Sequence, residues 1–132
     1  MTYKEYRSTL SEDINRLTLN KHIKACKYYF TTASFKIIFW YRLGSYIKSK
    51  KGFLKLFYPL VYFIELHIQW RVGINLVLGT KIKGGLMFDH FSGIVINPGA
   101  IIGRNCTIYQ CVTIGNTTGF KRGGERKMYD WR

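Results

Sequence analysis

Apolar residues recur every six positions between Leu78 and Thr118. One column with this phase holds Leu78, Ile96, Ile102, Ile108 and Ile114. A second column lies two residues earlier in each six and holds Leu76, Ile82, Phe88, Ile94, Ala100, Cys106 and Val112. Neither an α-helix, with a period of about 3.6 residues, nor a strand, with a period of about 2, places two apolar positions in every six. The pattern therefore indicates a repeat of another kind.

A coil of hexapeptide rungs explains this period. Each rung forms one flat side and three rungs complete a coil, with the aliphatic residue pointing inward and glycine relieving the corner, as at Gly79, Gly103 and Gly115. Both columns are expected to keep their six-residue spacing through little more than two coils of about 18 residues each. We therefore predict a mixed fold, which consists of an α-helical region at 1–72, a short left-handed parallel β-helix at 73–118, and a loop and tail at 119–132.

The start of the chain is expected to be helical. Residues 3–33 are predicted to form helix because Thr9 and Glu12 have the spacing of a capping box. Over residues 34–48 the apolar positions recur at three and four residues, which predicts an amphipathic helix.

The stretch 53–70 is apolar nearly all round, and Pro59 divides it. Three interpretations are open: a membrane span, a helix on a membrane surface, and an ordinary packed helix, which we favour because charged residues interrupt the run. The surface interpretation rests on neighbouring lysines, namely Lys48, Lys50, Lys51 and Lys55. His67 is expected to be packed. Neither His67 nor His22 has a second ligand at metal spacing, so no metal is expected.

The composition fits one folded domain with a strong positive charge. The chain has 132 residues, of which 47% are hydrophobic and 17% aromatic, enough for a core. Lys and Arg total 21 against 7 Asp and Glu, which gives a net charge of +14. This excess indicates an anionic partner, such as cofactor phosphates, an acidic polysaccharide or a membrane face. Nothing beyond charge supports nucleic acid.

The cysteines and the N-terminus bear on the compartment. Cys26, Cys106 and Cys111 are odd in number and lack CxxC spacing, which favours a reducing, cytoplasmic setting. The first residues lack the apolar run of a secretory signal, so no export is expected. Association with the inner face of the membrane stays open because of the lysines beside the stretch 53–70.

The six-residue column fails at Gly84 and His90, where its phase requires a bulky aliphatic residue. The second failure lies within Phe88–Ile96, which carries an Asp-His-x-x-Gly element directly before hexapeptide rungs. Together with Cys111–Thr117, this segment resembles the serine acetyltransferase family and its relatives that acetylate bacterial polysaccharides. The match covers about residues 34 to 126.

The resemblance implies an acetyl-CoA-dependent O-acetyltransferase. Acetyl transfer to a hydroxyl needs a base, and imidazole, with a pKa of about 6.5, suits this task at neutral pH. The resemblance implies that His90 deprotonates the acceptor and that Asp89 positions the imidazole or the acceptor. Consecutive strand residues point to opposite faces, so contact between the two requires a turn. The alternative is a structural histidine buried in the prism and bonded to the backbone.

The resemblance also implies the cofactor contacts and the assembly. Acetyl-CoA lies between adjacent prisms in the resembling enzymes, and a homotrimer or a dimer of trimers is expected. The expected contacts in this chain are Thr113, Gly115, Asn116, Lys121 and Arg126, the last two for phosphate or carboxylate charge.

Two departures from serine acetyltransferases bear on the acceptor. Their second histidine follows a Gly-Gly-Asp-Arg segment, whereas here Gly123–Arg126 is followed by Lys127. Their aspartate in the helical region would align near Asn20 or Lys21, where no acid stands. A sugar hydroxyl, as in capsule or exopolysaccharide O-acetylation, is therefore at least as good a candidate acceptor as serine.

The end of the sequence departs as well. The family continues with further rungs, but the residues after Arg126 carry no hexapeptide signal. Solenoids usually need about three or more repeats and a cap, so we expect either a chain truncated at its C-terminus or an open end covered by the helices and neighbouring subunits. The alternative function is a truncated, non-catalytic module for oligomerisation or membrane-surface binding.

Overall fold

The computed structural model describes residues 1–18 and 32–115, and residues 19–31 and 116–132 lie outside this description. The helices are α1 (Tyr3–Leu17), α3 (Ala33–Lys48), the short 3-10 helix η1 (Phe53–Phe57) and α4 (Tyr58–Val72). The strands are β1 (Ile74–Leu76), β2 (Lys81–Ile82), β3 (Met87–Phe88), β4 (Ile94–Ile96), β5 (Ile101–Ile102), β6 (Thr107–Ile108) and β7 (Thr113–Ile114). The predicted order, helices first and short parallel strands afterwards, is confirmed.

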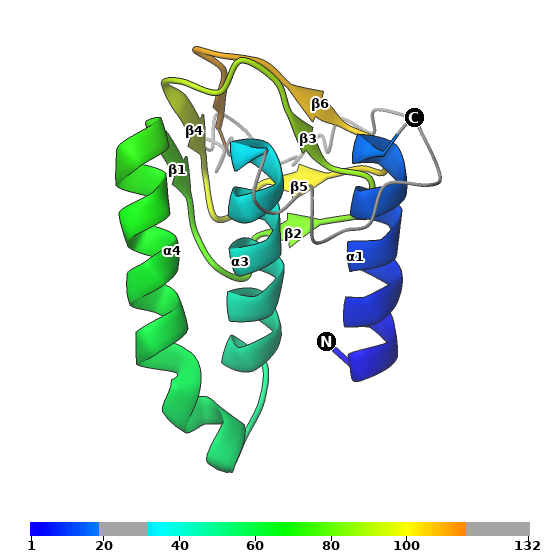
Figure 1. The fold of residues 1–132 in the computed structure, drawn as a ribbon, viewed down its shortest axis with the longest axis vertical. Helices are drawn as coiled ribbons and strands as arrows, with labels where there is room; N and C mark the ends of the chain where they lie inside the picture. The colour runs from blue at the N-terminus through cyan, green and yellow to red at the C-terminus, as the bar shows by residue number, and fades with distance from the viewer. Residues whose placement is uncertain (19–31, 116–132) are drawn as a thin grey trace, which may run out of the picture.

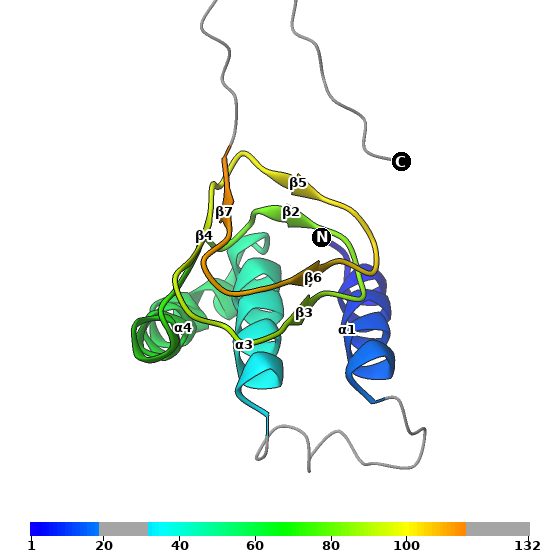
Figure 2. The ribbon, with the colours of Figure 1, turned by 90° about the horizontal axis from the view of Figure 1, so that it is seen from above.

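The strands stack into three parallel sheets, β1-β4-β7, β2-β5 and β3-β6. Stacked neighbours are one coil apart in the sequence, so the chain winds around three sides and returns over itself, as Figure 2 shows from above. One short strand on each side is what hexapeptide rungs predict.

The register between stacked strands corrects the prediction. In the first coil each residue pairs with the residue twenty positions later, as Leu76 does with Ile96. In the next coil the step is eighteen, because Ile96 pairs with Ile114. The expectation that both columns keep step is therefore wrong, since two extra residues lie between β3 and β4. The first coil stacks its inward residues on the other column of the second coil: Leu76 on Ile96, Ile82 on Ile102 and Phe88 on Ile108.

The inside of the coil forms the hydrophobic core. Both apolar columns are buried or half-buried there, and the core continues into α3 through Ile37, Ile38 and Tyr41. Residues next to the inward ones, such as Val95 and Ile101, face outward. This alternation is the side-chain period of a strand, retained within each short side of the coil.

Helix α1 begins after its N-cap, Thr2. The Thr2 hydroxyl accepts a hydrogen bond from the Glu5 backbone N–H, and the Glu5 carboxylate accepts one from the Thr2 N–H. This is a capping box, but it is not the predicted one, because Thr9 and Glu12 lie inside the helix. Thr2 and Glu5 have the same spacing as Thr9 and Glu12, so spacing alone does not identify the pair that caps the helix.

Helices α3 and α4 follow the predicted boundaries closely. The amphipathic helix expected over 34–48 corresponds to α3. Pro59 separates η1 from α4 and lies in the first turn of α4, where a missing backbone N–H costs no helical hydrogen bond. The three longer helices run side by side with α3 in the middle, and they pack against the first coil (Figure 1).

A buried ion pair joins two helices to the first coil. Arg42 of α3 donates from Nε to Oδ2 of Asp13 in α1 at 2.8 Å, and both side chains are buried. The guanidinium also donates to the carbonyls of Ile82 at 2.6 Å and Lys83 at 2.8 Å. Asp13 Oδ1 accepts from the Leu86 N–H at 2.8 Å. Burial raises the pKa of Asp13, and the Arg42 guanidinium and the Leu86 amide counteract part of this rise.

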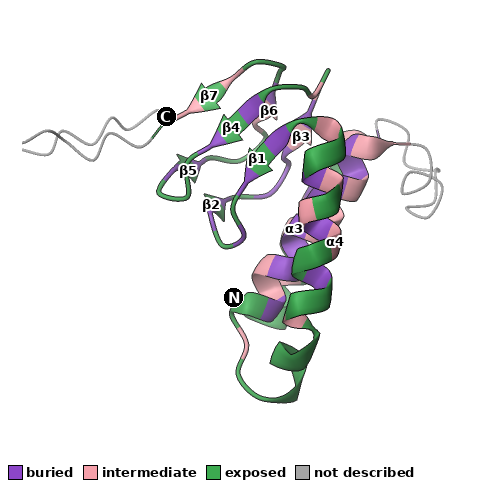
Figure 3. Cartoon of the chain, turned by 90° about the vertical axis from the view of Figure 1, so that its left-hand side faces the viewer, coloured by how far each residue is buried: buried purple, intermediate pink, exposed green. Residues whose placement is uncertain are grey.

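Helix α4 packs by one side only. Its buried residues are Val61, Glu65 and Gln69, and the Gln69 side chain exchanges hydrogen bonds with the backbone of Leu76 at 2.7 and 2.8 Å. Its other side is exposed, as the green parts of the α4 ribbon in Figure 3 show, and the exposed residues there include Leu60, Phe63 and Trp70. The prediction of an ordinary packed helix is therefore correct for one side of α4 only. The prediction that His67 is packed is wrong, because this residue is exposed. Within the described ranges, no helix is long and apolar enough to cross a membrane.

Candidate active site

The candidate site is the corner of the coil between β3 and β4, residues Asp89–Gly93. Eight positions separate Phe88 from Ile96, whereas six separate their stacked partners Ile108 and Ile114. This corner has two left-handed residues, with φ of 48° at His90 and 63° at Gly93. A residue with a side chain pays about 1–2 kcal/mol for this conformation, so His90 holds local strain of the kind found at functional sites.

Backbone hydrogen bonds hold this corner in place. The Asp89 N–H donates to the Ile108 carbonyl at 3.0 Å, and the Cys111 N–H donates to the Ser92 carbonyl at 2.7 Å. The Ile94 N–H donates to the Gly73 carbonyl at 3.1 Å, at the end of α4. The corner is therefore fixed both by the coil that follows and by the helix that precedes it.

The side chains of His90 and Asp89 lie side by side on the outside of this corner. Their side chains are 77% and 44% exposed, and 3.8 Å separates His90 Nε2 from Asp89 Oδ1. This distance is too long for a hydrogen bond but allows an attraction between carboxylate and imidazolium. The turn needed for consecutive residues to meet is present. The alternative of a histidine buried in the prism is wrong, because His90 is exposed.

The predicted cofactor residues fall into two groups. Thr113 is exposed in β7 and pairs with Val95, in the strand that leaves the Asp89–Gly93 corner, and Gly115 follows it. No hydrogen bond or ion pair joins Thr113 or Gly115 to His90 in the described part of the chain. The other predicted cofactor contacts, Asn116, Lys121 and Arg126, lie outside the described residues. So do the positions compared for the acceptor, namely Asn20, Lys21 and Gly123–Lys127.

Sequence reasoning missed two neighbours of His90. The exposed residues Ser92 and Cys111 meet where the two corners stack, and Cys111 has its own left-handed φ of 57°. A side chain added at Gly93 would contact Cys111 Sγ at 3.6 Å. The eighteen-residue step of the second coil places Cys111 over Gly93, and the predicted coil of about eighteen residues already pairs these two positions.

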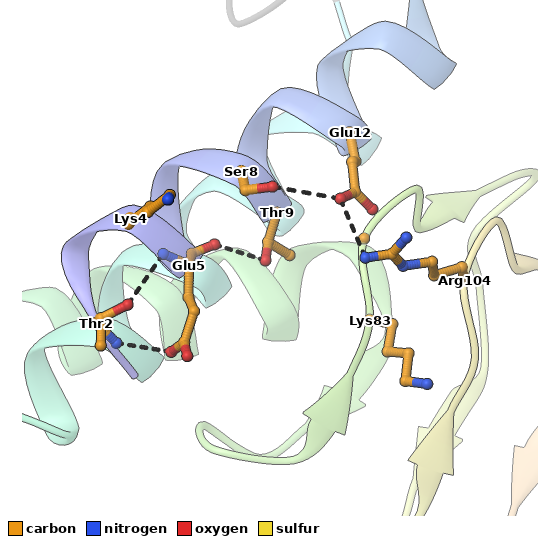
Figure 4. Close-up of a pocket in the computed structure, with 9 residues that line it drawn as sticks. Thr2, Lys4, Glu5, Ser8, Thr9, Glu12, Lys83 and Arg104 are labelled. Atoms are coloured by element: carbon orange, nitrogen blue, oxygen red, sulfur yellow. Dashed lines mark hydrogen bonds and ion pairs between the residues drawn. The ribbon is translucent and has the colours of Figure 1, made fainter.

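A cleft of about 710 Å³ lies at a different corner, between α1 and the coil (Figure 4). Glu12 reaches from α1 toward Arg104, 3.6 Å away, and accepts a hydrogen bond from the Ser8 hydroxyl at 3.4 Å. Gly84 lies beneath the Glu12 side chain, which would overlap any added Cβ. This packing explains the first failure of the apolar column. Among the described residues, those that line this cleft include no histidine, which is the base that the predicted chemistry uses.

Comparison with known proteins agrees with the resemblance in the sequence. No model of a known protein family matches the chain. The serine acetyltransferase of Helicobacter pylori (strain ATCC 700392 / 26695) is 35% identical over 81 residues, which are 61% of this chain and 44% of that protein. The serine acetyltransferase of Escherichia coli (strain K12) is 34% identical over 67 residues, 51% of this chain and 24% of that protein. That of Synechococcus elongatus is 41% identical over 54 residues, 41% of this chain and 21% of that protein.

The fold also has a solved counterpart. A structure of a serine acetyltransferase in complex with cysteine matches with a TM-score of 0.64 and 24% identity, and the match covers 94% of this chain and 49% of that one. The chain thus spans less than half the length of the relatives it matches. The serine acetyltransferase-like character expected from the Asp-His-x-x-Gly element and its rungs is confirmed.

Proposed function

We propose that this serine acetyltransferase-like chain carries the catalytic corner of an acetyl-CoA-dependent O-acetyltransferase. The observation that supports the proposal most directly is the position of His90. It lies exposed in a two-residue extension of the coil, beside Asp89, in a strained backbone conformation. A histidine retained only for packing would be expected inside the prism.

His90 acts as the general base in this proposal. An imidazole nitrogen takes the proton of the acceptor hydroxyl while the oxygen attacks the thioester carbonyl of acetyl-CoA. The tetrahedral intermediate then collapses, the carbon–sulfur bond breaks, and the imidazolium returns its proton to the departing CoA sulfur. The products are an O-acetyl ester and CoA, and the enzyme regains its neutral histidine.

Asp89 is the positioning residue for this histidine. Its backbone N–H is hydrogen-bonded to the Ile108 carbonyl, which holds the Asp89 backbone in place beside the imidazole ring. The Asp89 carboxylate lies 3.8 Å from Nε2 and orients the ring by charge, and the ring nitrogen without a hydrogen accepts the hydroxyl proton. The carboxylate also stabilises the imidazolium formed during attack.

Acetyl-CoA is proposed to bind along the outside of β7, against Thr113 and Gly115, with Asn116, Lys121 and Arg126 as further contacts. We propose a left-handed coil and a homotrimer, as the resemblance implies, with the cofactor between neighbouring prisms. Exposed apolar residues on the outer faces of the coil, such as Ile101 and Val95, support contacts between prisms.

The acceptor is proposed to be serine or a sugar hydroxyl. The resemblance places the substrate-binding aspartate near Asn20 or Lys21, where the sequence has no acid, and the buried Asp13 carboxylate of α1 is occupied by Arg42 and the Leu86 amide. It is therefore not available to bind the amino group of serine. This occupation favours an acceptor without a cationic group, such as a sugar.

Acetyl transfer by the purified chain tests the proposal. The chain is incubated with acetyl-CoA and serine or a panel of sugars, and the CoA and the ester are quantified by chromatography. Thiol reagents are unsuitable because Cys111 is exposed and would react. We expect His90→Ala to lower the rate by about two to four orders of magnitude, and Asp89→Asn to lower it less.

The matched control is His67→Ala, which removes another exposed histidine far along the chain. It should leave the rate unchanged, and circular dichroism should report the same fold for all variants. Equal rates for His90→Ala and the unaltered chain would remove His90 from the mechanism. A folded chain that acetylates none of the acceptors would contradict the proposed activity itself.

A further inference from the structure

The end of the molecule formed by η1 and the start of α4 exposes a cluster of apolar side chains. They are Phe53, Leu54, Leu56, Phe57, Leu60 and Phe63, and we call this cluster the η1–α4 tip. Phe53 is 75% exposed and Leu56 is 71% exposed, although such residues are usually buried. The rings of Phe53 and Phe57 meet edge to face with 5.6 Å between their centroids, so these two side chains form one apolar surface. Surface of this kind marks an interaction site.

Helix α4 lacks, near the tip, the polar outward side of an ordinary surface helix. Its buried residues are Val61, Glu65 and Gln69, whereas Leu60 and Phe63 are exposed. A helix that faces water on its outer side normally places polar residues there. The outward side of α4 near the tip is therefore suited to a surrounding less polar than water.

The residues around the tip are positively charged. Four lysines occur there, Lys48, Lys50, Lys51 and Lys55, and no acid occurs from residue 48 to residue 64. Lys51 and Lys55 are exposed. The next acid, Glu65, is buried on the inward side of α4 and contributes no carboxylate to this surface.

The tip lies at the end of the molecule away from the candidate active corner. Figures 1 and 3 show η1 beyond the end of α3, near the N-terminus of the chain. Ser34, at the start of α3, accepts a hydrogen bond from the N–H of Phe88, beside the active corner, whereas Lys48 ends this helix near the tip. The 16 residues of α3 span about 24 Å. A surface that covers the tip thus leaves the Asp89–Gly93 corner open.

We propose that the η1–α4 tip docks on the surface of an anionic phospholipid bilayer. Its apolar side chains enter the headgroup region, and the lysines around them lie among lipid phosphates and acidic headgroups. This proposal rests on the apolar exposure and on the charge, and it does not depend on the acetyltransferase chemistry. A second copy of the chain fits the tip less well, because two copies would bring the lysines of both tips together, and residues 48–64 contain no acid in either copy.

Vesicle flotation with the full chain tests this proposal. One set of vesicles contains phosphatidylcholine alone, and another contains phosphatidylcholine mixed with phosphatidylglycerol. We expect the chain to float with the anionic vesicles, to stay behind with the neutral ones, and to be released by high salt. Replacing two exposed lysines in Lys51→Gln/Lys55→Gln should weaken binding about 25-fold, because each lysine near an anionic surface contributes about fivefold.

Two pairs of variants separate the tip from the overall charge of the chain. Phe53→Ser/Leu56→Ser removes apolar contact at the tip and should abolish flotation, whereas Tyr109→Ser, at an exposed position of the coil outside the tip, should leave it unchanged. Lys81→Gln/Lys83→Gln is the matched control for the lysine variant, because it also removes two charges and both lysines are exposed on the coil. All the substituted sites are exposed, so thermal unfolding should be nearly unaltered.

Three results would overturn the proposal. Absence of binding to anionic vesicles would exclude a lipid surface. Equal losses in Lys81→Gln/Lys83→Gln and in Lys51→Gln/Lys55→Gln would mean that net charge, not the tip, drives binding. Sedimentation without vesicles measures self-association of the unaltered chain and of Phe53→Ser/Leu56→Ser. If the unaltered chain does not float and the variant no longer self-associates, the tip binds a second copy of the chain.

Discussion

Replacing Asp13 by asparagine keeps the shape of the side chain but removes the negative charge that faces Arg42. The guanidinium stays buried, bound to the carbonyls of Ile82 and Lys83, without a compensating carboxylate. Breaking a buried ion pair on one side costs about 3–5 kcal/mol. A domain of this size has about 5–15 kcal/mol of unfolding free energy, so Asp13→Asn should lose a large share of its stability.

The neighbouring residue provides a matched control. Glu12 also reaches from α1 to an arginine of the coil, but its carboxylate lies 3.6 Å from Arg104 and the pair is partly exposed. Glu12→Gln should therefore cost less than about 1 kcal/mol. Urea denaturation at one fixed protein concentration measures both variants, because any association of subunits shifts apparent stability by mass action.

A double-mutant cycle then isolates the pair. Arg42→Met leaves a buried Asp13 carboxylate and two unpaired carbonyls, whereas Asp13→Asn/Arg42→Met removes both charges. The double variant should lose less stability than the sum of the two single losses, since each single change strands the other charge. If Asp13→Asn costs no more than Glu12→Gln, water reaches Arg42 and the buried ion pair does not hold the helices on the coil.

Two further predictions concern stability. Burial raises the pKa of Glu65 to about 7 from 4.5, so the folded chain holds this proton to a higher pH than the unfolded chain does. The free energy of unfolding therefore falls as the pH rises between these two values, by up to about 3 kcal/mol. Glu65→Gln should flatten that slope in urea titrations at about pH 5 and about pH 8, and an unchanged slope would exclude Glu65 as its source. Gly85→Ala should cost at least about 1–2 kcal/mol, because φ is 77° and the added Cβ would overlap Asn105, whereas Gly103→Ala meets open space and should cost less than about 0.5 kcal/mol. Equal costs at the two glycines in thermal unfolding would contradict this account of the corner.

The sequence predicted the coil well because its signal is local and repeated. Every rung places aliphatic residues at the same two positions, so an error at one rung does not change the period. The order of helices and strands follows from the change of period near residue 73. Pro59 marked the boundary between η1 and α4 for an equally local reason, since proline cannot lie inside a helix without loss of a hydrogen bond.

Features that depend on distant contacts could not be predicted in this way. Asp13 and Arg42 are far apart in the sequence, and neither has a neighbour that identifies it as buried. The exposure of Phe53 and Leu56 depends on where α4 packs, which the apolar composition of the stretch conceals. The prediction that His67 is packed failed for the same reason, because a helix that is apolar all round does not indicate its inward side.

The register error and the candidate active corner have one cause. The next corner carries one left-handed residue, Cys111, and its N–H is bonded to Ser92 beside Gly93, which makes Gly93 its counterpart. His90 and Phe91 are then the two residues added to the hexapeptide spacing. The apolar column failed at His90 because this residue belongs to no rung.

Deleting these two added residues tests that reading. The deletion of His90 and Phe91 restores six positions between the inward residues, so the coil should still fold, with a loss of about 1–3 kcal/mol for the half-buried Phe91 ring, while acetyl transfer disappears. The matched deletion of Tyr109 and Gln110 shortens a regular corner and should disrupt the second coil, which circular dichroism and urea denaturation would report. If the two deletions destabilise the chain equally, the extra length at Asp89–Gly93 is needed for folding. In that case the corner is a structural part of the coil, and its strained histidine is not evidence for catalysis.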